Sequence, residues 1–173
     1  MTRKHLLTIC LAILLPAALP AAGTLRFSNF HDQTAMFSVR SIAQQEDGMI
    51  WFGTERNLYS FDGYDLLPHP CPDGHIQVNK LLFWGDGLLL GTNGGLYSFL
   101  PAASSFRRAR PFDGALVRDL QSIGNFVYVA TDSGLYRYDP RTETAGRIAD
   151  GDFIVFGMDG GLSAVSEIYT QSG

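Results

Sequence analysis

The chain contains an internal repeat, which constrains its fold more than any other feature. Three segments begin at Val39, Val78 and Val117, so each step is 39 residues (78 − 39 and 117 − 78). Two further landmarks recur in the same order at steps of 38 or 39: Thr54, Thr92 and Thr131, and the Leu-Tyr pairs at 58–59, 96–97 and 135–136. Self-similarity at one fixed period is the signature of a repeat architecture. The sequence therefore predicts tandem copies of one structural unit.

Each unit has the pattern of a meander of short β-strands. In the first unit, residues 39–45 form one strand, Asp47-Gly48 is a hairpin-turn signal, and residues 49–54 form a strongly apolar second strand. Apolar runs this continuous predict a strand that is covered on both faces. A third strand begins at Leu58, and a weaker fourth follows. Four short strands in this period are typical of a β-propeller blade, so we predict an all-β propeller arc of about three and a half four-stranded blades whose ring is incomplete.

The repeat also sets the predicted domain boundaries. Residues 24–173 form the partial propeller, with blades near 39–70, 78–110 and 117–149 and an incomplete fourth at 152–173. The fourth unit can be aligned through Thr170–Gly173 with Thr131–Gly134, or through Gly157–Leu162 with Gly91–Leu96. The second alignment leaves too little chain for four strands, so we favour Asp159-Gly160 as the first hairpin turn. Both indicate the front of a longer protein or a truncated reading frame. The alternative is a four-bladed ring closed by residues 24–30.

Composition argues against several other classes of protein. Hydrophobic residues make up 46% of the 173 residues, whereas a disordered chain needs low hydrophobicity and high net charge. Nineteen glycines argue against the long helices of a coiled coil. With 13 basic and 17 acidic residues, the chain lacks the basic excess of a nucleic-acid-binding protein. We therefore expect a packed β-rich domain and no nucleic-acid partner.

The first residues have the pattern of an export signal. In residues 1–23, a basic start precedes the apolar run 6–15, which is too short to span a bilayer, and small residues at 21–23 offer a cleavage site. An uncleaved membrane anchor and a lipoprotein signal at Cys10 are less favoured alternatives. The mature chain would keep Cys71 as its single cysteine, so we expect an exported protein without an internal disulfide.

Parts of the sequence resemble a known family. The segments Phe27–Phe30, Val39–Thr54 and Leu58–Tyr64 look like the opening of the two-component regulator propeller proteins, the periplasmic sensor regions of hybrid histidine kinases common in gut Bacteroidetes. The family pattern runs Val, Ile, an acidic-Gly turn, Ile-Trp-Ile-Gly-Thr, Gly-Leu, an aromatic residue and Asp-Gly. The resemblance covers residues 25–140, although Asn57 replaces the glycine before Leu58.

This resemblance implies a periplasmic ligand-sensing segment of a two-component sensor. It further implies many more blades, a small β-sandwich domain, a parent protein anchored in the inner membrane with cytoplasmic kinase and response-regulator modules, a homodimeric full-length sensor, and recognition of glycan fragments. Two other classes of function stay open. They are a secreted or surface propeller scaffold that binds protein, and the front end of a propeller lyase or hydrolase.

Few residues indicate chemistry of their own. His69, Cys71 and His75 could ligate zinc, but their spacing matches no standard motif, so we expect a loop, no metal site and no cofactor. Glycan hydrolysis needs two positioned carboxylates, whereas most acids here stand in hairpin turns that turn chemistry explains. We therefore expect no catalytic residues and no enzymatic activity within this chain. Trp51 lies in a strand predicted to be buried, where core packing is expected.

Ligand-binding residues are predicted where the units depart from the repeat. The turns after the second strands open on the same rim as the connections between blades, so both can reach one ligand. Arg56 and Asn57 replace bare backbone of the other units, and Arg110 lies in a connection. We hypothesise that these three residues bind an oligosaccharide, with Trp84 as a weaker candidate. The alternative is a rim that only contacts solvent.

Overall fold

The computed structural model describes residues 38–151, 153–158 and 161–166. Contacts divide the chain into two units, Met1–His31 and Asp32–Gly173, and every described residue belongs to the second. The predicted export signal, residues 24–30 and residues 170–173 lie outside the described residues, so those predictions stay predictions.

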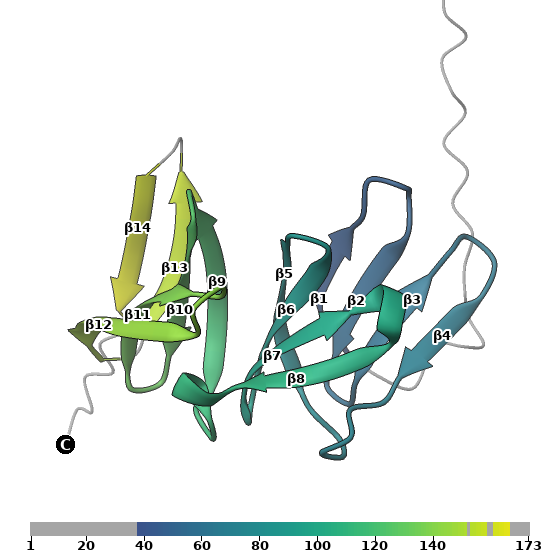
Figure 1. The fold of residues 1–173 in the computed structure, drawn as a ribbon, viewed down its shortest axis with the longest axis horizontal. Coiled ribbons are helices and arrows are strands. Elements are labelled where there is room, and N and C mark those ends of the chain that lie inside the picture. The colour runs from purple at the N-terminus through teal and green to yellow at the C-terminus, as the bar shows by residue number, and fades with distance from the viewer. Residues whose placement is uncertain (1–37, 152, 159–160, 167–173) are drawn as a thin grey trace, which may run out of the picture. The chain divides into compact units, whose positions relative to one another are not determined.

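The described residues form three four-stranded antiparallel sheets and one hairpin (Figure 1). The first sheet consists of β1 Val39–Gln44, β2 Ile50–Thr54, β3 Leu58–Phe61 and β4 Leu66–His69. The second consists of β5 Val78–Trp84, β6 Gly87–Thr92, β7 Gly95–Leu100 and β8 Ser105–Ala109. The third consists of β9 Val117–Ile123, β10 Phe126–Thr131, β11 Gly134–Asp139 and β12 Thr144–Asp150. In each sheet the strands lie in chain order, which confirms the predicted four-stranded meander.

A further hairpin follows the third sheet. Strands β13 Phe153–Met158 and β14 Gly161–Ser166 pair so that Met158 faces Gly161. This pairing agrees with the register that places a turn at residues 159–160, which are themselves outside the described residues. The described helices are two short 3-10 turns, η1 Pro101–Ala103 and η2 Arg110–Phe112, and neither is long and apolar enough to cross a membrane.

Successive sheets pack face to face. The first strands are neighbours, since β1 contacts β5, β5 contacts β9 and β9 contacts β13. One buried apolar cluster lies between the first and second sheets, and another lies between the second and third. In β6, Leu88 and Leu90 belong to the first cluster and Leu89 to the second. For β6, this confirms the prediction that the apolar second strand is covered on both faces.

Pairs of aliphatic side chains, three residues apart, pack each sheet onto the sheet before it. Val78 and Leu81 lie against Gly53, where a Cβ atom on the glycine would stand 2.7 Å from Val78 Cγ1. The same contact recurs in the next pair of sheets, with Val117 and Leu120 against Gly91. The recurring spacing of these residues along the repeat therefore reflects a close approach between sheets.

The first sheet carries an equivalent aliphatic pair that is exposed. Val39 and Ile42 are 42% and 63% exposed, whereas Val78 and Leu81 are 0% and 4% exposed. Among the described residues the sheets are not closed into a ring. The described part of the chain therefore has the fold of a partial β-propeller, as the repeat predicts.

Each second strand ends in a threonine that closes the following turn. Thr92 Oγ1 donates to the Gly95 carbonyl oxygen at 2.8 Å and accepts the Gly94 N–H at 3.1 Å. Thr54 and Thr131 donate in the same way to the carbonyl oxygen three residues later. The recurrence of one residue before the same turn therefore has a structural cause, since each hydroxyl bonds to the backbone of the turn.

Candidate functional site

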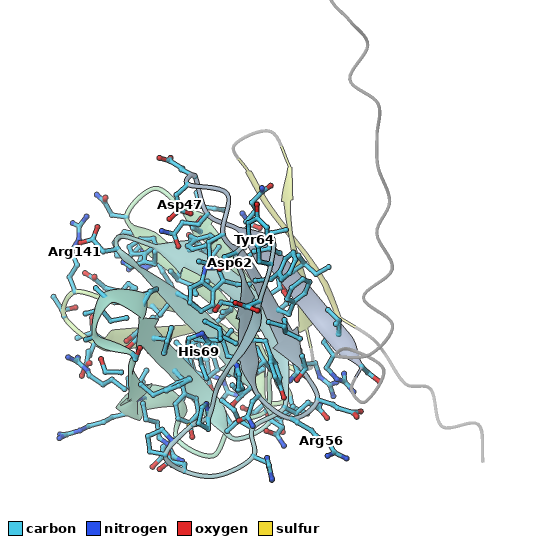
Figure 2. All side chains as sticks on the ribbon, turned by 90° about the vertical axis from the view of Figure 1, so that its right-hand side faces the viewer. Asp47, Arg56, Asp62, Tyr64, His69 and Arg141 are labelled. Atoms are coloured by element: carbon cyan, nitrogen blue, oxygen red, sulfur yellow. The ribbon has the colours of Figure 1, made fainter. Side chains whose placement is uncertain are left out.

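The sheets have two chemically distinct ends. At one end lie the turns β2–β3, β6–β7 and β10–β11 together with the connections between sheets, and we call this end the connection rim. At the other end, the hairpin rim, lie the turns between the first and second and between the third and fourth strands. Figure 2 shows Arg56 at the first end and Asp47, Tyr64 and Arg141 towards the second.

A β-bulge near the connection rim interrupts the first strand of every sheet. In β1, Val39 pairs with Thr54 and Ser41 pairs with Gly53, so Arg40 is the extra residue of the bulge. The pairings of β5 and β9 leave Asn79 and Arg118 in the same position. Bulges commonly redirect a side chain beside a functional site. The repeat therefore places one long polar side chain at the same point of each sheet.

These three bulge residues line one groove at the connection rim. We call it the inner-strand groove, and it has a volume of about 540 Å³. Its other lining residues are Gln77, Lys80, Leu116 and Asp119. A concave surface with a few converging polar groups is the usual form of a binding site. The inner-strand groove is therefore our candidate functional site.

Several contacts hold the wall of the inner-strand groove in place. Lys80 Nζ lies 2.9 Å from Asp119 Oδ1, which joins the second sheet to the third. The Asn79 side-chain amide donates to the Val117 carbonyl oxygen at 2.9 Å and accepts from the Gln77 amide at 2.9 Å. These polar groups are therefore preorganised by contacts between neighbouring sheets.

Of the four residues predicted from sequence, three lie on the connection rim. Arg56 and Arg110 are exposed there. Asn57 is only 8% exposed, and its amide bonds with the His75 ring at 3.4 Å and accepts the Cys71 N–H at 3.5 Å. Asn57 therefore holds the connection between the first two sheets, a role that its departure from the repeat did not reveal.

Trp84 lies apart from the other three. It pairs with Gly87 beside the β5–β6 hairpin, at the hairpin rim. There it lines a separate groove of about 500 Å³ between the second and third sheets, together with Tyr138 and an ion pair between Arg107 and Glu143. The structure therefore does not bring Trp84 together with Arg56, Asn57 and Arg110.

Arg108 ties the two described connections to the second sheet. Its guanidinium contacts Asp73 at 2.9 Å and Asp113 at 2.5 Å, and it lies over the Tyr97 ring. The hydrogen bond to Asp113 raises the pKa of Arg108, while burial raises the pKa of the Tyr97 hydroxyl. Both groups therefore keep their protons at neutral pH, as a structural clamp requires.

The histidines and cysteine of residues 69–75 do not converge. The His69 ring packs at a tilt against both Trp51 and Phe99, which also contact each other. Its Nε2 lies 2.8 Å from Ser60 Oγ, and burial lowers its pKa. Burial raises the pKa of the Cys71 thiol, which disfavours the reactive thiolate. Within the described ranges, no group of three or more His, Cys, Asp or Glu side chains is placed to hold a metal ion. We therefore assign no metal to this segment.

The sequence prediction missed Arg40, Lys80 and Arg118. A signal for two of them was present, because Arg40, Asn79 and Arg118 each follow a landmark valine directly. Three polar residues at the same step of an apolar-rich repeat could have identified the position. The bulge that directs these side chains into one groove could not be predicted, because it does not change the pattern of apolar residues along the strand.

Comparison with known proteins identifies similar solved structures. No protein-family profile and no curated protein matches the chain. The extracellular domain of BT4673 from B. thetaiotaomicron, described as a hybrid two-component system, is 21% identical with a TM-score of 0.61, over 73% of this chain and 21% of that chain. The corresponding domain of BT3049, described in the same way, is 19% identical with a TM-score of 0.58, over 74% of this chain and 23% of that chain. The computationally designed Ika4 protein is 13% identical with a TM-score of 0.55, over 76% of this chain and 92% of that chain.

These likenesses bear on the fold. This chain spans about a fifth of the BT4673 and BT3049 domains. At this level of identity the likeness shows a shared arrangement of sheets, which agrees with the partial propeller described above. The two natural neighbours come from the class of protein that the sequence resemblance indicated.

Proposed function

We propose that this chain is a periplasmic ligand-sensing segment of a two-component sensor, the hybrid histidine kinase type. The observation that carries the proposal is the agreement of two independent features. The motifs of the first unit resemble the sensor propellers of that family, and the sheets match extracellular domains of proteins described as hybrid two-component systems. Export to the periplasm follows from the same proposal.

In this proposal the described sheets are the first blades of a larger sensor. The chain spans about a fifth of the BT4673 and BT3049 domains, which supports further blades in the parent protein. The exposed pair Val39 and Ile42 gives such a blade a surface to cover. The parent would be a homodimer anchored in the inner membrane, with the kinase in the cytoplasm.

Binding, rather than catalysis, suits the acids of the described sheets. Backbone N–H groups of Asp65 and Tyr64 lower the pKa of Asp62, which therefore stays ionised and closes its turn. Asp47 and Asp139 accept turn N–H groups in the same manner. A glycosidase needs one carboxyl group that keeps its proton, a role that Asp62 does not suit because its pKa is lowered.

We assign the ligand as an oligosaccharide held at the connection rim. The inner-strand groove supplies the pocket, and the exposed Arg56 and Arg110 supply donors for hydroxyl or carboxylate oxygens. Asn57 contributes by fixing the connection between the first two sheets. Trp84, on the other rim, would contact only a second ligand molecule.

Calorimetry tests this assignment. The whole exported gene product is titrated with a panel of oligosaccharides. We expect at least one to bind, and we expect Arg56→Ala and Arg110→Ala each to weaken it by about threefold to tenfold, the usual worth of one charge-assisted hydrogen bond. Arg141→Ala, on the hairpin rim, is the matched control and should leave the affinity unchanged. Binding that responds to Arg141→Ala and not to the other two would place the site on the opposite rim.

A further inference from the structure

A second groove lies between the second and third sheets, at the hairpin rim. It is the groove of about 500 Å³ that Trp84 lines, and we call it the hairpin-rim groove. Leu89, Ala109 and Tyr138 also line it, and all three are buried members of the apolar cluster between these two sheets. Trp84 is half-buried and packs against the same cluster. The interior of the groove is therefore aromatic and aliphatic.

The first pair of sheets fills the equivalent space with rings. Trp51 and His69 of the first sheet both pack against Phe99 of the second, with ring centroids 5.6 and 5.1 Å apart. Leu89 is the equivalent of Trp51, and Ala109 is the equivalent of His69, because each pairs with the same member of the Leu-Tyr-Ser-Phe segment that both sheets contain. Two rings are thus replaced by two smaller side chains. The replacement leaves space for a planar ring beside the third sheet.

The third sheet adds one hydroxyl group at this place. Tyr138 stands where the first two sheets have Phe61 and Phe99, and it is 3% exposed. No residue in the described part of the chain is hydrogen-bonded to its hydroxyl. A buried hydroxyl without a hydrogen bond is costly and uncommon in native proteins. Burial raises the pKa of this hydroxyl, so it keeps its proton at neutral pH and offers a donor that the described fold does not use.

The other side chains of the groove favour an uncharged ligand. Arg107 pairs with Glu143 and Arg108 pairs with Asp113, so neither guanidinium needs an anionic ligand. A sugar carries hydroxyl groups around its whole edge, and an apolar wall would remove their water without replacing the hydrogen bonds. A planar aromatic ring loses little water there and can stack against Trp84.

We propose that the hairpin-rim groove binds a planar, uncharged aromatic ring that carries a hydrogen-bond acceptor, and that the Tyr138 hydroxyl donates to this acceptor. Trp84 and Leu89 supply the apolar contacts. The inference goes beyond the proposed function, because both the groove and the ligand differ from the oligosaccharide site at the connection rim. It can therefore fail while the proposed function stands.

Two compounds of the same shape test the hydrogen bond. Quinoline has one ring nitrogen that accepts a hydrogen bond, whereas naphthalene has none, and saturation-transfer NMR measures the binding of each to the whole exported gene product. We expect both to bind. Tyr138→Phe, which restores the residue of the other two sheets, should weaken quinoline by about threefold to tenfold and leave naphthalene unchanged, because one hydrogen bond is lost. Tyr128→Phe, in the same sheet but outside the groove, is the matched control and should leave both unchanged.

A second variant tests the space in the groove. Leu89→Trp restores the side chain of the first sheet and should exclude both compounds from a protein that still melts cooperatively. If this variant does not fold, Tyr138→Phe still decides the inference.

Four results would overturn the inference. They are the failure of both compounds to bind, equal effects of Tyr138→Phe and Tyr128→Phe on quinoline, binding that survives in a folded Leu89→Trp variant, and displacement of quinoline by galactose. The last would assign the groove to a sugar. Each of these results concerns the hairpin rim, so the oligosaccharide titration of Arg56 and Arg110 variants tests the proposed function separately.

Discussion

Single residues of this protein carry structural roles that depend on partners far along the chain. Thr92 satisfies the turn that follows its own strand, whereas Asn57 reaches the connection 14 and 18 residues later. Arg108 reaches Asp73, 35 residues earlier. The local role of the threonines could be predicted from the repeat, because the same residue recurs before the same turn. The roles of Asn57 and Arg108 could not, since their partners lie in the connections between sheets, whose sequences differ from one unit to the next.

The first prediction concerns the threonine hydroxyls. Thr92→Val keeps the shape of the buried side chain and removes its bonds to Gly94 and Gly95. We expect the free energy of unfolding to fall by about 1–2 kcal/mol, because buried turn groups lose their partner. Denaturant unfolding of the whole exported gene product measures this, with the exposed Thr142→Val as the control. A loss no larger than that of the control would show that the hydroxyl has no structural role.

The second prediction concerns pH. Burial lowers the pKa of His69 below its ordinary value of 6.5, so the unfolded chain binds a proton on this residue more readily than the folded chain does. Stability should therefore be constant above about pH 6.5 and fall as the pH drops below it, towards the lower folded pKa. His69→Gln should reduce that slope, whereas the exposed His75→Gln should keep it. Thermal melts across pH 5–8 would contradict this if the two variants showed the same slope.

At the scale of strands and sheets, the hydrophobic pattern determined most of what could be predicted. The apolar second strands, the hairpin turns and the four-stranded meander all recur three times. A weak signal in the sequence of one unit could therefore be interpreted from the stronger signal at the same position of the other two. The bulges at Arg40, Asn79 and Arg118 escaped prediction because an added residue at the end of a strand changes its pairing but not its composition. The groove that they form therefore became evident only in three dimensions.

The third prediction concerns the contact between sheets. A methyl group at Gly91 would stand 2.7 Å from Val117 Cγ1. A methyl group at Gly94 would have no atom within 4 Å among those compared. Gly91→Ala should therefore destabilise the protein by about 1–3 kcal/mol through overpacking, and Gly94→Ala should change its stability far less. Denaturant unfolding of the two variants measures the difference. Equal effects would mean that the sheets separate easily and that the close approach adds little to stability.

At the scale of the whole molecule, the aliphatic pairs indicate how the sheets continue. Val78 with Leu81 and Val117 with Leu120 are buried against the preceding sheet, while Val39 and Ile42 are 42% and 63% exposed. Repetition predicted this stacking, since every inner unit must be covered on both faces. The ligand could not be read from the repeat, because a ligand contacts the residues that differ between units.

The fourth prediction follows from this exposed pair. A polypeptide of residues 38–166 should self-associate, because an apolar sheet face drives association. The double variant Val39→Lys/Ile42→Lys should reduce that association, whereas Ile148→Lys, at an exposed isoleucine of β12, should not. Sedimentation velocity measures both. A monomeric unsubstituted polypeptide would show that this face is covered within the segment itself.

The central claim is that these blades belong to the sensor of a histidine kinase, and phosphorylation of the native polypeptide tests it most directly. The polypeptide is isolated from membranes of the cells that express it, with an antibody raised against residues 78–110, and incubated with labelled ATP. The account predicts one polypeptide that carries these blades and acquires an acid-labile phosphohistidine, at a level that changes when the bound oligosaccharide is added. An exported polypeptide that carries the blades and acquires no phosphohistidine would contradict it.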